Sequence, residues 1–230
     1  AFTGTSITLN DSGVTDVFNA GSLTFTSAGA VAITENSATD LSGTSTAGSL
    51  ALTSAGAITD TAAASLTVGA NAAFTGTSIT LGDTGADVFN AVSLTFTSAG
   101  AVAISEDSDS DLAGTSAAGS LALTSTGAIT DAAAASTTVT GNAALSGTSI
   151  TIGDAGTDVF NAGTLTFTSA GVVAITEDSA SELAGTSTAG SLALTSAGAI
   201  TDAASASLTV AGNAAFSGTA ITINDSGVTD

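Results

Sequence analysis

The sequence predicts an all-β fold, a parallel β-solenoid in which short strands stack coil upon coil, and three observations support this prediction. One phrase, GSLTFTSAGAVAIT at residues 21–34, returns with few changes at 93–105 and 164–176. A shorter relative, GSLALTSAGAIT, begins at Gly48 and recurs from Gly119 and Gly190. Within each phrase, apolar residues alternate with Ser and Thr, which is the period of a strand with one buried face.

These phrases are nested in a larger repeat of about 71 residues, which recurs at Phe2, Phe74, Leu145 and Phe216. Phrase anchors divide each large unit into three pieces, which predicts about ten coils of about 22–27 residues. We expect the Phe and Leu anchors to stack in one internal column. The whole of 1–230 is then one continuous solenoid segment of a longer array, with large repeats at approximately 1–72, 73–143 and 144–214 and a partial copy at 215–230.

Each predicted coil contains three short alternating stretches, as the central copy illustrates. Its first coil has inward pairs at 72–74 and 79–81 and a step at 88–89, and its second has inward pairs at 94–96 and 102–104, followed by a weaker stretch at Leu112. The third coil follows the same plan with Leu121, Leu123, Ile129 and Val139. A glycine occupies the same corner of successive phrases, where a tight bend favours it: Gly29, Gly56, Gly100, Gly127 and Gly171.

The composition excludes several classes of function. The chain has 20 acidic residues, no Lys, Arg or His, and a formal charge of -20. Binding to nucleic acids or to anionic lipid surfaces requires basic side chains, so neither is expected. No apolar run approaches the roughly 18 residues of a membrane span. Without His, Lys, Arg or Cys, the usual catalytic bases, nucleophiles and anion clamps are missing, and we expect no enzymatic activity.

The sharpest chemical feature is a series of acidic residues that follow the second strand of their coils at a nearly constant interval of one coil. We expect one carboxylate per coil along a single edge, where neighbours about 5 Å apart repel by roughly 0.8 kcal/mol in water. The series comprises Asp11, Glu35, Asp60, Asp83, Glu106, Asp131, Asp154, Glu177, Asp202 and Asp225. The longest predicted coils add Asp107, Asp109, Asp111, Asp178 and Glu182.

Two interpretations of this acidic ladder remain open. Hard cations prefer carboxylate oxygens, so Ca²⁺ is the candidate ligand, with all fifteen acids as candidate metal ligands. Alternatively, these acids are solvated turn residues that keep the rod soluble and discourage lateral association.

Threonine pairs form a further pattern, at Thr24 and Thr26, Thr95 and Thr97, and Thr166 and Thr168. Such pairs resemble the flat threonine arrays of ice-binding solenoids. Their alternative role is that of ordinary outward strand residues with high β-propensity.

The repeated xLxLTSxGxIT pattern, as in SLALTSAGAIT at 49–59, resembles the repeats of filamentous haemagglutinin-type large bacterial exoproteins and adhesins. The resemblance extends over essentially the whole chain. It implies a right-handed parallel β-helix that is secreted to the cell surface and acts there as a rod or an adhesin.

We therefore expect a mechanical role for this chain, as a rod, fibre or sheath outside the cell. The expected partners are other copies or neighbouring repeats, and divalent cations. The stalk of a secreted adhesin, with a calcium-stabilised ladder, is the alternative, and an ice-binding solenoid is a minor one.

Overall fold

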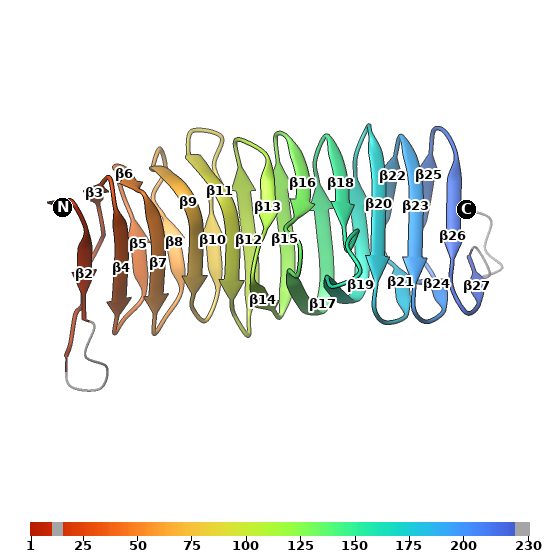
Figure 1. The fold of residues 1–230 in the computed structure, drawn as a ribbon, viewed down its shortest axis with the longest axis horizontal. Coiled ribbons are helices and arrows are strands. Elements are labelled where there is room, and N and C mark those ends of the chain that lie inside the picture. Colours follow the sequence, from red (N-terminus) through yellow and green to blue (C-terminus); the bar gives the residue numbers. More distant parts are fainter. Residues whose placement is uncertain (11–15, 224–230) are drawn as a thin grey trace.

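The computed structural model describes residues 1–10 and 16–223, which form one elongated solenoid with the first and last strands at opposite ends of the rod (Figure 1). The strands pair in parallel and stack as about ten coils. Among the described residues, no helix is long and apolar enough to cross a membrane. The predicted fold class, a parallel β-solenoid, is confirmed.

Short strands make up the described chain, and four of them (β9, β11, β17 and β19) are long enough to continue from one side of a coil to the next. The first strands are β1 (Phe2–Gly4), β2 (Ile7–Leu9), β3 (Phe25–Ser27), β4 (Ala30–Glu35), β5 (Thr39–Leu41), β6 (Thr44–Ala47), β7 (Ser49–Ser54), β8 (Ile58–Asp60) and β9 (Ser65–Thr75). The central strands are β10 (Ile79–Leu81), β11 (Val88–Thr97), β12 (Ala101–Glu106), β13 (Ser110–Leu112), β14 (Thr115–Ala118), β15 (Ser120–Ser125), β16 (Ala128–Asp131), β17 (Ser136–Ser146) and β18 (Ser149–Ile152). The last strands are β19 (Val159–Thr168), β20 (Val172–Glu177), β21 (Ser181–Leu183), β22 (Thr186–Ala189), β23 (Ser191–Ser196), β24 (Ile200–Asp202), β25 (Ser207–Val210), β26 (Ala214–Ser217) and β27 (Ile221–Thr222).

A coil has three sides, as β4, β5 and β6 show. The next coil consists of β7, β8 and the first half of β9, each stacked on the strand of the same side. On the first side, Ile33 pairs with Leu52, and on the third, Ser45 pairs with Leu66. The alternating phrases therefore place one residue in two inside the rod.

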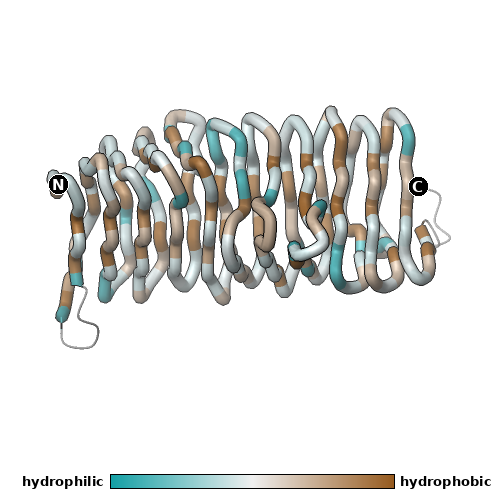
Figure 2. Tube along the Cα trace, in the orientation of Figure 1, coloured by the Kyte–Doolittle hydropathy of each residue, from teal (hydrophilic) through white to brown (hydrophobic). Residues whose placement is uncertain are grey.

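The inward residues form one continuous apolar core along the rod. The predicted inward pairs are buried: Leu94 and Phe96 are 0% exposed, and the neighbouring Thr97 is on the surface. Figure 2 shows this alternation as apolar positions spaced along every coil. Burying a Leu, Ile or Phe side chain contributes about 1.5–3 kcal/mol, so this alternation accounts for the stability of a chain without disulfides.

The coil length differs from the prediction. The number of residues in one turn of the solenoid varies along the chain. Leu94 stacks on Leu112 after a short turn, whereas Ile7 stacks on Val31 after a longer one. The longest of the predicted coils does not exist as a single coil, because Leu52 stacks on Ile33. With about 21 residues per coil, the large repeat is not a whole number of coils. Equivalent phrases of successive copies consequently lie in different stacks, and the single column of Phe and Leu anchors is wrong.

The glycine corner is confirmed at Gly29, which lies between β3 and β4. A Cβ atom at this position would approach the carbonyl oxygen of Thr5, in the coil below, to 2.3 Å. The close passage of two backbones, which no other residue permits, therefore explains this glycine.

Candidate functional site

The structure does not arrange the predicted acids as a ladder along one edge. Glu35, Glu106 and Glu177 point into the rod and are only 1–2% exposed. The strand period explains this, because Val102, Ile104 and Glu106 alternate along β12 and must share its inner face. The three glutamates are therefore neither solvated turn residues nor members of an outer row.

Each buried glutamate accepts a hydrogen bond from the backbone N–H of an alanine fifteen residues earlier in the chain. Oε1 of Glu106 accepts the N–H of Ala91 in β11 at 2.7 Å, and Oε2 accepts the hydroxyl of Ser110 at 2.7 Å. Burial raises the pKa of Glu106, against the lowering effect of these two hydrogen bonds. Glu35 and Glu177 make the same contacts in their copies. A buried N–H requires an acceptor, so these acids have a structural role.

The acids of the longer predicted coils are also held by local hydrogen bonds. Oδ2 of Asp107 accepts the N–H of Phe89, and Asp178 does the same for Phe160 in the next copy. The others are distributed along the surface: Asp109 accepts the N–H of Ala128, Asp111 accepts the hydroxyl of Thr130, and Glu182 is exposed. Asp202 occupies the end of β24 and is half-buried, while Asp11 and Asp225 lie outside the described residues.

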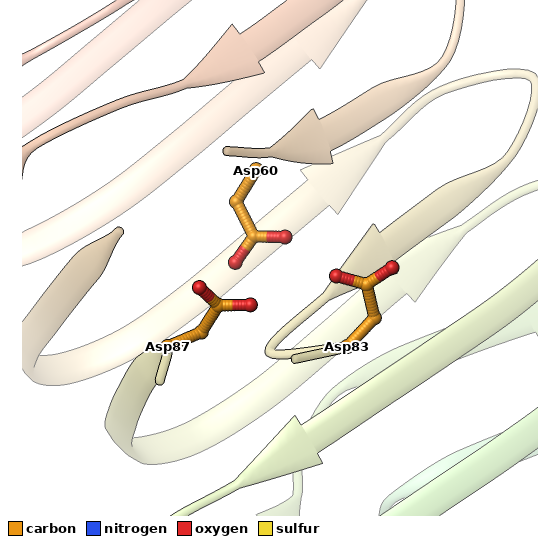
Figure 3. A group of neighbouring side chains, drawn as sticks. All are labelled: Asp60, Asp83 and Asp87. Atoms are coloured by element: carbon orange, nitrogen blue, oxygen red, sulfur yellow. The ribbon is translucent and has the colours of Figure 1, made fainter. Parts of the chain in front are cut away.

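Within residues 1–10 and 16–223, two groups of three carboxylates do converge, and four of the predicted residues belong to them. The first cluster is Asp60, Asp83 and Asp87, whose side chains approach one another in Figure 3. The second cluster comprises the equivalent residues of the next copy, Asp131, Asp154 and Asp158. In each cluster, one carboxylate oxygen from each residue lies within 4.8 Å of the other two.

The sequence reasoning missed Asp87 and Asp158, since they fall outside the regular spacing of the other acids. Both are only 7% exposed, and each comes directly before a Val-Phe-Asn step that opens a strand. An acid that recurs before a buried phenylalanine in successive copies is the signal that identifies them.

Asp60 is brought into the first cluster by its place in the stack of inward residues. It pairs with Leu41 of β5, and the pairing of Ile58 with Ile79 brings it level with Leu81. An acid thus replaces an apolar residue at the end of β8. Its Oδ2 accepts the N–H of Gly82 at 2.9 Å.

Gly82 allows the chain to turn tightly around this carboxylate. Its φ is +68°, and a Cβ atom would approach the carbonyl oxygen of Ser105 to 2.3 Å. Both the left-handed backbone and the contact require glycine. The turn directly after Gly82 then brings Asp83 and Asp87 towards Asp60.

Asp87 closes this turn. Its Oδ2 accepts the backbone N–H and the hydroxyl of Thr84 at 2.9 and 2.8 Å, and its own N–H donates to the carbonyl oxygen of Thr84 at 3.0 Å. Its Oδ1 is buried and accepts no hydrogen bond, and the same holds for Oδ1 of Asp60. The cluster therefore contains two buried carboxylate oxygens with unused acceptor capacity.

The pKa values of Asp60 and Asp87 are shifted in opposite directions. Burial raises the pKa of Asp60, the N–H of Gly82 opposes this shift, and the charges of Asp87 and Asp83 add to it. Burial also acts to raise the pKa of Asp87, but the hydrogen bonds from Thr84, with the nearby N–H groups of Ala63 and Ala64, outweigh it and lower the pKa. Asp87 is thus held as an anion beside an acid that resists ionisation.

No basic side chain exists in the sequence to neutralise either cluster. Two charges no more than 4.8 Å apart repel by at least about 0.9 kcal/mol in water and by at least about 3.5 kcal/mol at an effective dielectric constant of 20. A hollow of about 310 Å³, lined in part by Gly82, Asp83 and Asp87, opens beside the first cluster. Protons or cations from solution can therefore reach Asp83 and Asp87.

The threonine pairs do not form a free, flat array. The first threonine of each pair hydrogen-bonds to a carbonyl oxygen of the adjacent coil, as Thr95 does to Ala113 at 2.9 Å. The second threonine stacks in a single row, where Thr26 lies between Thr3 and Thr46. Only one threonine of each pair therefore remains available on the outer surface, so the threonines form rows that are one residue wide.

Comparison with protein families identifies one relationship. Residues 28–95, 99–168 and 170–229 each match the family described as repeats of unknown function (DUF5649). No curated protein and no solved structure gives a match. Because the three matches together cover most of the sequence, the chain belongs to the DUF5649 repeat family.

Proposed function

We propose that this chain is an extracellular structural repeat, which forms a rigid rod, fibre or sheath at a bacterial cell surface. The observation that supports the proposal best is the unbroken core. Buried residues from Ile7 to Ile200 belong to one apolar cluster that follows the rod axis. A solenoid of this kind grows by adding coils, so its length follows directly from the number of repeats.

The offset between the repeat and the coil supports the same role. Equivalent phrases lie in different stacks, so no single side of the rod accumulates all copies of one phrase. Such a rod presents similar chemistry to all directions, which suits a spacer or a fibre better than a receptor with one binding face. The proposal includes secretion, self-association with further repeats, and no catalytic role, in line with a sequence that lacks His, Lys, Arg and Cys.

Electron microscopy of arrays with increasing numbers of the large repeat tests the rod. At about 21 residues per coil and about 4.8 Å between strands, each added copy should lengthen the particle by about 16 Å at constant width. Particles that widen, or that fold back on themselves as copies are added, would contradict the rod.

The stalk of a secreted adhesin is the second candidate, and the resemblance of SLALTSAGAIT to repeats of filamentous haemagglutinin-type exoproteins favours it. The stalk and the fibre differ in what the rod carries. Cell-binding assays with the repeat chain alone and with the natural full-length protein separate them. In an adhesin, only the full-length protein binds, whereas repeats of a fibre assemble into filaments without another domain.

A further inference from the structure

We propose that Asp60, Asp83 and Asp87 form a binding site for a divalent cation, and that Ca²⁺ is the ion that fits it. This inference goes beyond the rod, which does not depend on an ion. It concerns one defined turn and replaces the expectation of a row of acids along the whole solenoid.

The spacing of the ligand oxygens is compatible with Ca²⁺. The three residues each offer an oxygen within 4.8 Å of the others. Ca²⁺ binds oxygens at about 2.3–2.6 Å, so two of its ligands can be up to about 4.6–5.2 Å apart. Mg²⁺ binds at about 2.0–2.1 Å, allows separations of only about 4.2 Å, and gives up its water reluctantly.

An independent observation points to a ligand at this place. Asp87 is only 7% exposed, its carboxylate faces the cluster (Figure 3), and its buried Oδ1 accepts no hydrogen bond. Buried polar atoms in proteins nearly always have a partner. Thr84 already donates to the other oxygen of Asp87, and the N–H groups of Ala63 and Ala64 lie near this carboxylate without a hydrogen bond to Oδ1, so Oδ1 retains the capacity to bind a ligand.

That partner must come from solution. The sequence contains no Lys, Arg or His, and hard cations are the usual partners of clustered carboxylates. The hollow beside Asp83 and Asp87 provides access and room for the water molecules that complete the coordination of Ca²⁺.

The site would connect two coils. Asp60 ends β8, whereas Asp83 and Asp87 lie in the turn that follows β10, the strand stacked on β8. An ion held by all three acids therefore stabilises the stacking of successive coils, in addition to removing the repulsion among them.

A proton shared between Asp60 and Asp87 is the competing arrangement, and it makes the opposite prediction. In that case, neutralising Asp60 by Asp60→Asn stabilises the chain, and CaCl₂ has no effect. With a cation site, Asp60→Asn removes a ligand and abolishes the part of the CaCl₂ response that comes from the first cluster.

Calorimetric titration of the 230-residue chain with CaCl₂ after treatment with EDTA, with thermal unfolding followed by circular dichroism, tests the site. We expect a dissociation constant in the range of about 0.1–1 mM, a higher melting temperature in CaCl₂, and a much smaller response to MgCl₂. Asp83→Asn should weaken this binding at least about tenfold, because affinity follows the number of charged ligands.

Asp83 is exposed, so Asp83→Asn tests binding without disturbing the core, even if Asp87→Asn fails to fold. Glu182→Gln is the matched control, since it removes one exposed charge elsewhere and should leave the affinity within about twofold. No heat and no thermal shift up to about 10 mM CaCl₂ would overturn the proposal, as would equal effects of Asp83→Asn and Glu182→Gln.

Discussion

The two aspartate clusters occupy equivalent turns of consecutive copies and differ in one hydrogen-bond donor and one acceptor. Both turns begin at a glycine with positive φ, Gly82 or Gly153, whose N–H donates to an aspartate of the coil below. In the first turn, the hydroxyl of Thr84 donates to Asp87, whereas Ala155 stands at the corresponding place in the second. In the second turn, Oδ1 of Asp158 accepts the N–H of Ala134 at 2.6 Å, whereas the N–H of the equivalent Ala63 lies near Asp87 and lowers its pKa without a hydrogen bond to Oδ1.

This difference shows that the same turn can accommodate three aspartates with two different sets of hydrogen bonds. The second cluster satisfies Asp158 with backbone, while burial and the charges of Asp158, Asp154 and Asp111 raise the pKa of Asp131 to about 6, with the N–H of Gly153 opposing them. The first cluster leaves an oxygen of Asp87 unused but holds this residue as an anion. We therefore expect the first cluster to bind a cation more tightly and the second to retain a proton more readily.

The shared glycine should give the largest effect. Gly82→Ala and Gly153→Ala each force a left-handed residue to carry a Cβ, which would lie 2.3 Å from a carbonyl oxygen of the next coil. We expect each to destabilise the chain by at least about 2 kcal/mol, from the backbone conformation and the displaced strand together. Chemical denaturation followed by circular dichroism measures this loss.

Gly85→Ala and Gly156→Ala are matched controls in the same turns, because a Cβ there meets nothing within 4 Å. Gly82→Ala should also remove the response to CaCl₂ at the first cluster. A large difference in stability between Gly82→Ala and Gly153→Ala would contradict the structural equivalence of the two turns.

The pH dependence of stability should separate the clusters next. The pKa of Asp131 is raised from 3.8 to about 6 in the folded chain, so the folded state holds this proton more tightly than the unfolded state does. The resulting stability is complete below about pH 3.8 and is lost as the pH rises through about 6. In EDTA, Asp131→Asn should therefore reduce the fall in melting temperature between pH 4.5 and 7.5.

Solvent reaches this half-buried carboxyl and screens it, so we expect the reduction to be about 2–4 °C, the equivalent of about 1 kcal/mol in a chain of this size. Glu182→Gln provides the control for the loss of one acid from the surface. Identical slopes for the original chain and Asp131→Asn would show that Asp131 does not hold its proton more tightly when folded.

The core was predictable from the sequence, whereas the site was predictable only in part. Alternation alone identified Leu94 and Phe96 as inward residues, because strand geometry allows no other period. The same alternation places Glu106 inside, but its charge suggested the surface, and only the N–H of Ala91 that it satisfies explains its burial. Where a buried backbone N–H needs an acceptor, the two-residue period of the strand therefore predicts burial better than the charge of the side chain does.

The register of the coils could not be obtained from the repeats. Similar phrases predict similar strands, but any inward apolar pair can stack on any other, and Leu52 lies on Ile33 rather than on Phe25. Because the coil length varies, even a regular spacing of acids does not place them along one edge. Asp60 and Asp83 were found because they belong to the repeat, and Asp87 was missed because its role depends on the turn that Thr84 closes.

Exchanging the threonine between the turns is the finest test of the comparison. Thr84→Ala removes a hydroxyl that donates to Asp87 at 2.8 Å, so the pKa of Asp87 should rise and the chain should lose about 0.5–1.5 kcal/mol at pH 7. Ala155→Thr adds a hydroxyl beside Asp158 and should stabilise the second turn by a similar amount or less. Thermal unfolding and CaCl₂ titration at pH 5 and 7 measure both changes, and the calcium affinity of Thr84→Ala should fall more at pH 5, where a raised pKa leaves less Asp87 ionised.

The second turn supplies the matched control for this exchange. Thr157, two residues beyond Ala155, is exposed, and Thr157→Ala removes the same atoms as Thr84→Ala from a hydroxyl that closes no turn. A surface change of this kind should stay within about 0.5 kcal/mol. If Thr84→Ala and Thr157→Ala have the same effect at both pH values, the hydroxyl of Thr84 does not set the charge of Asp87.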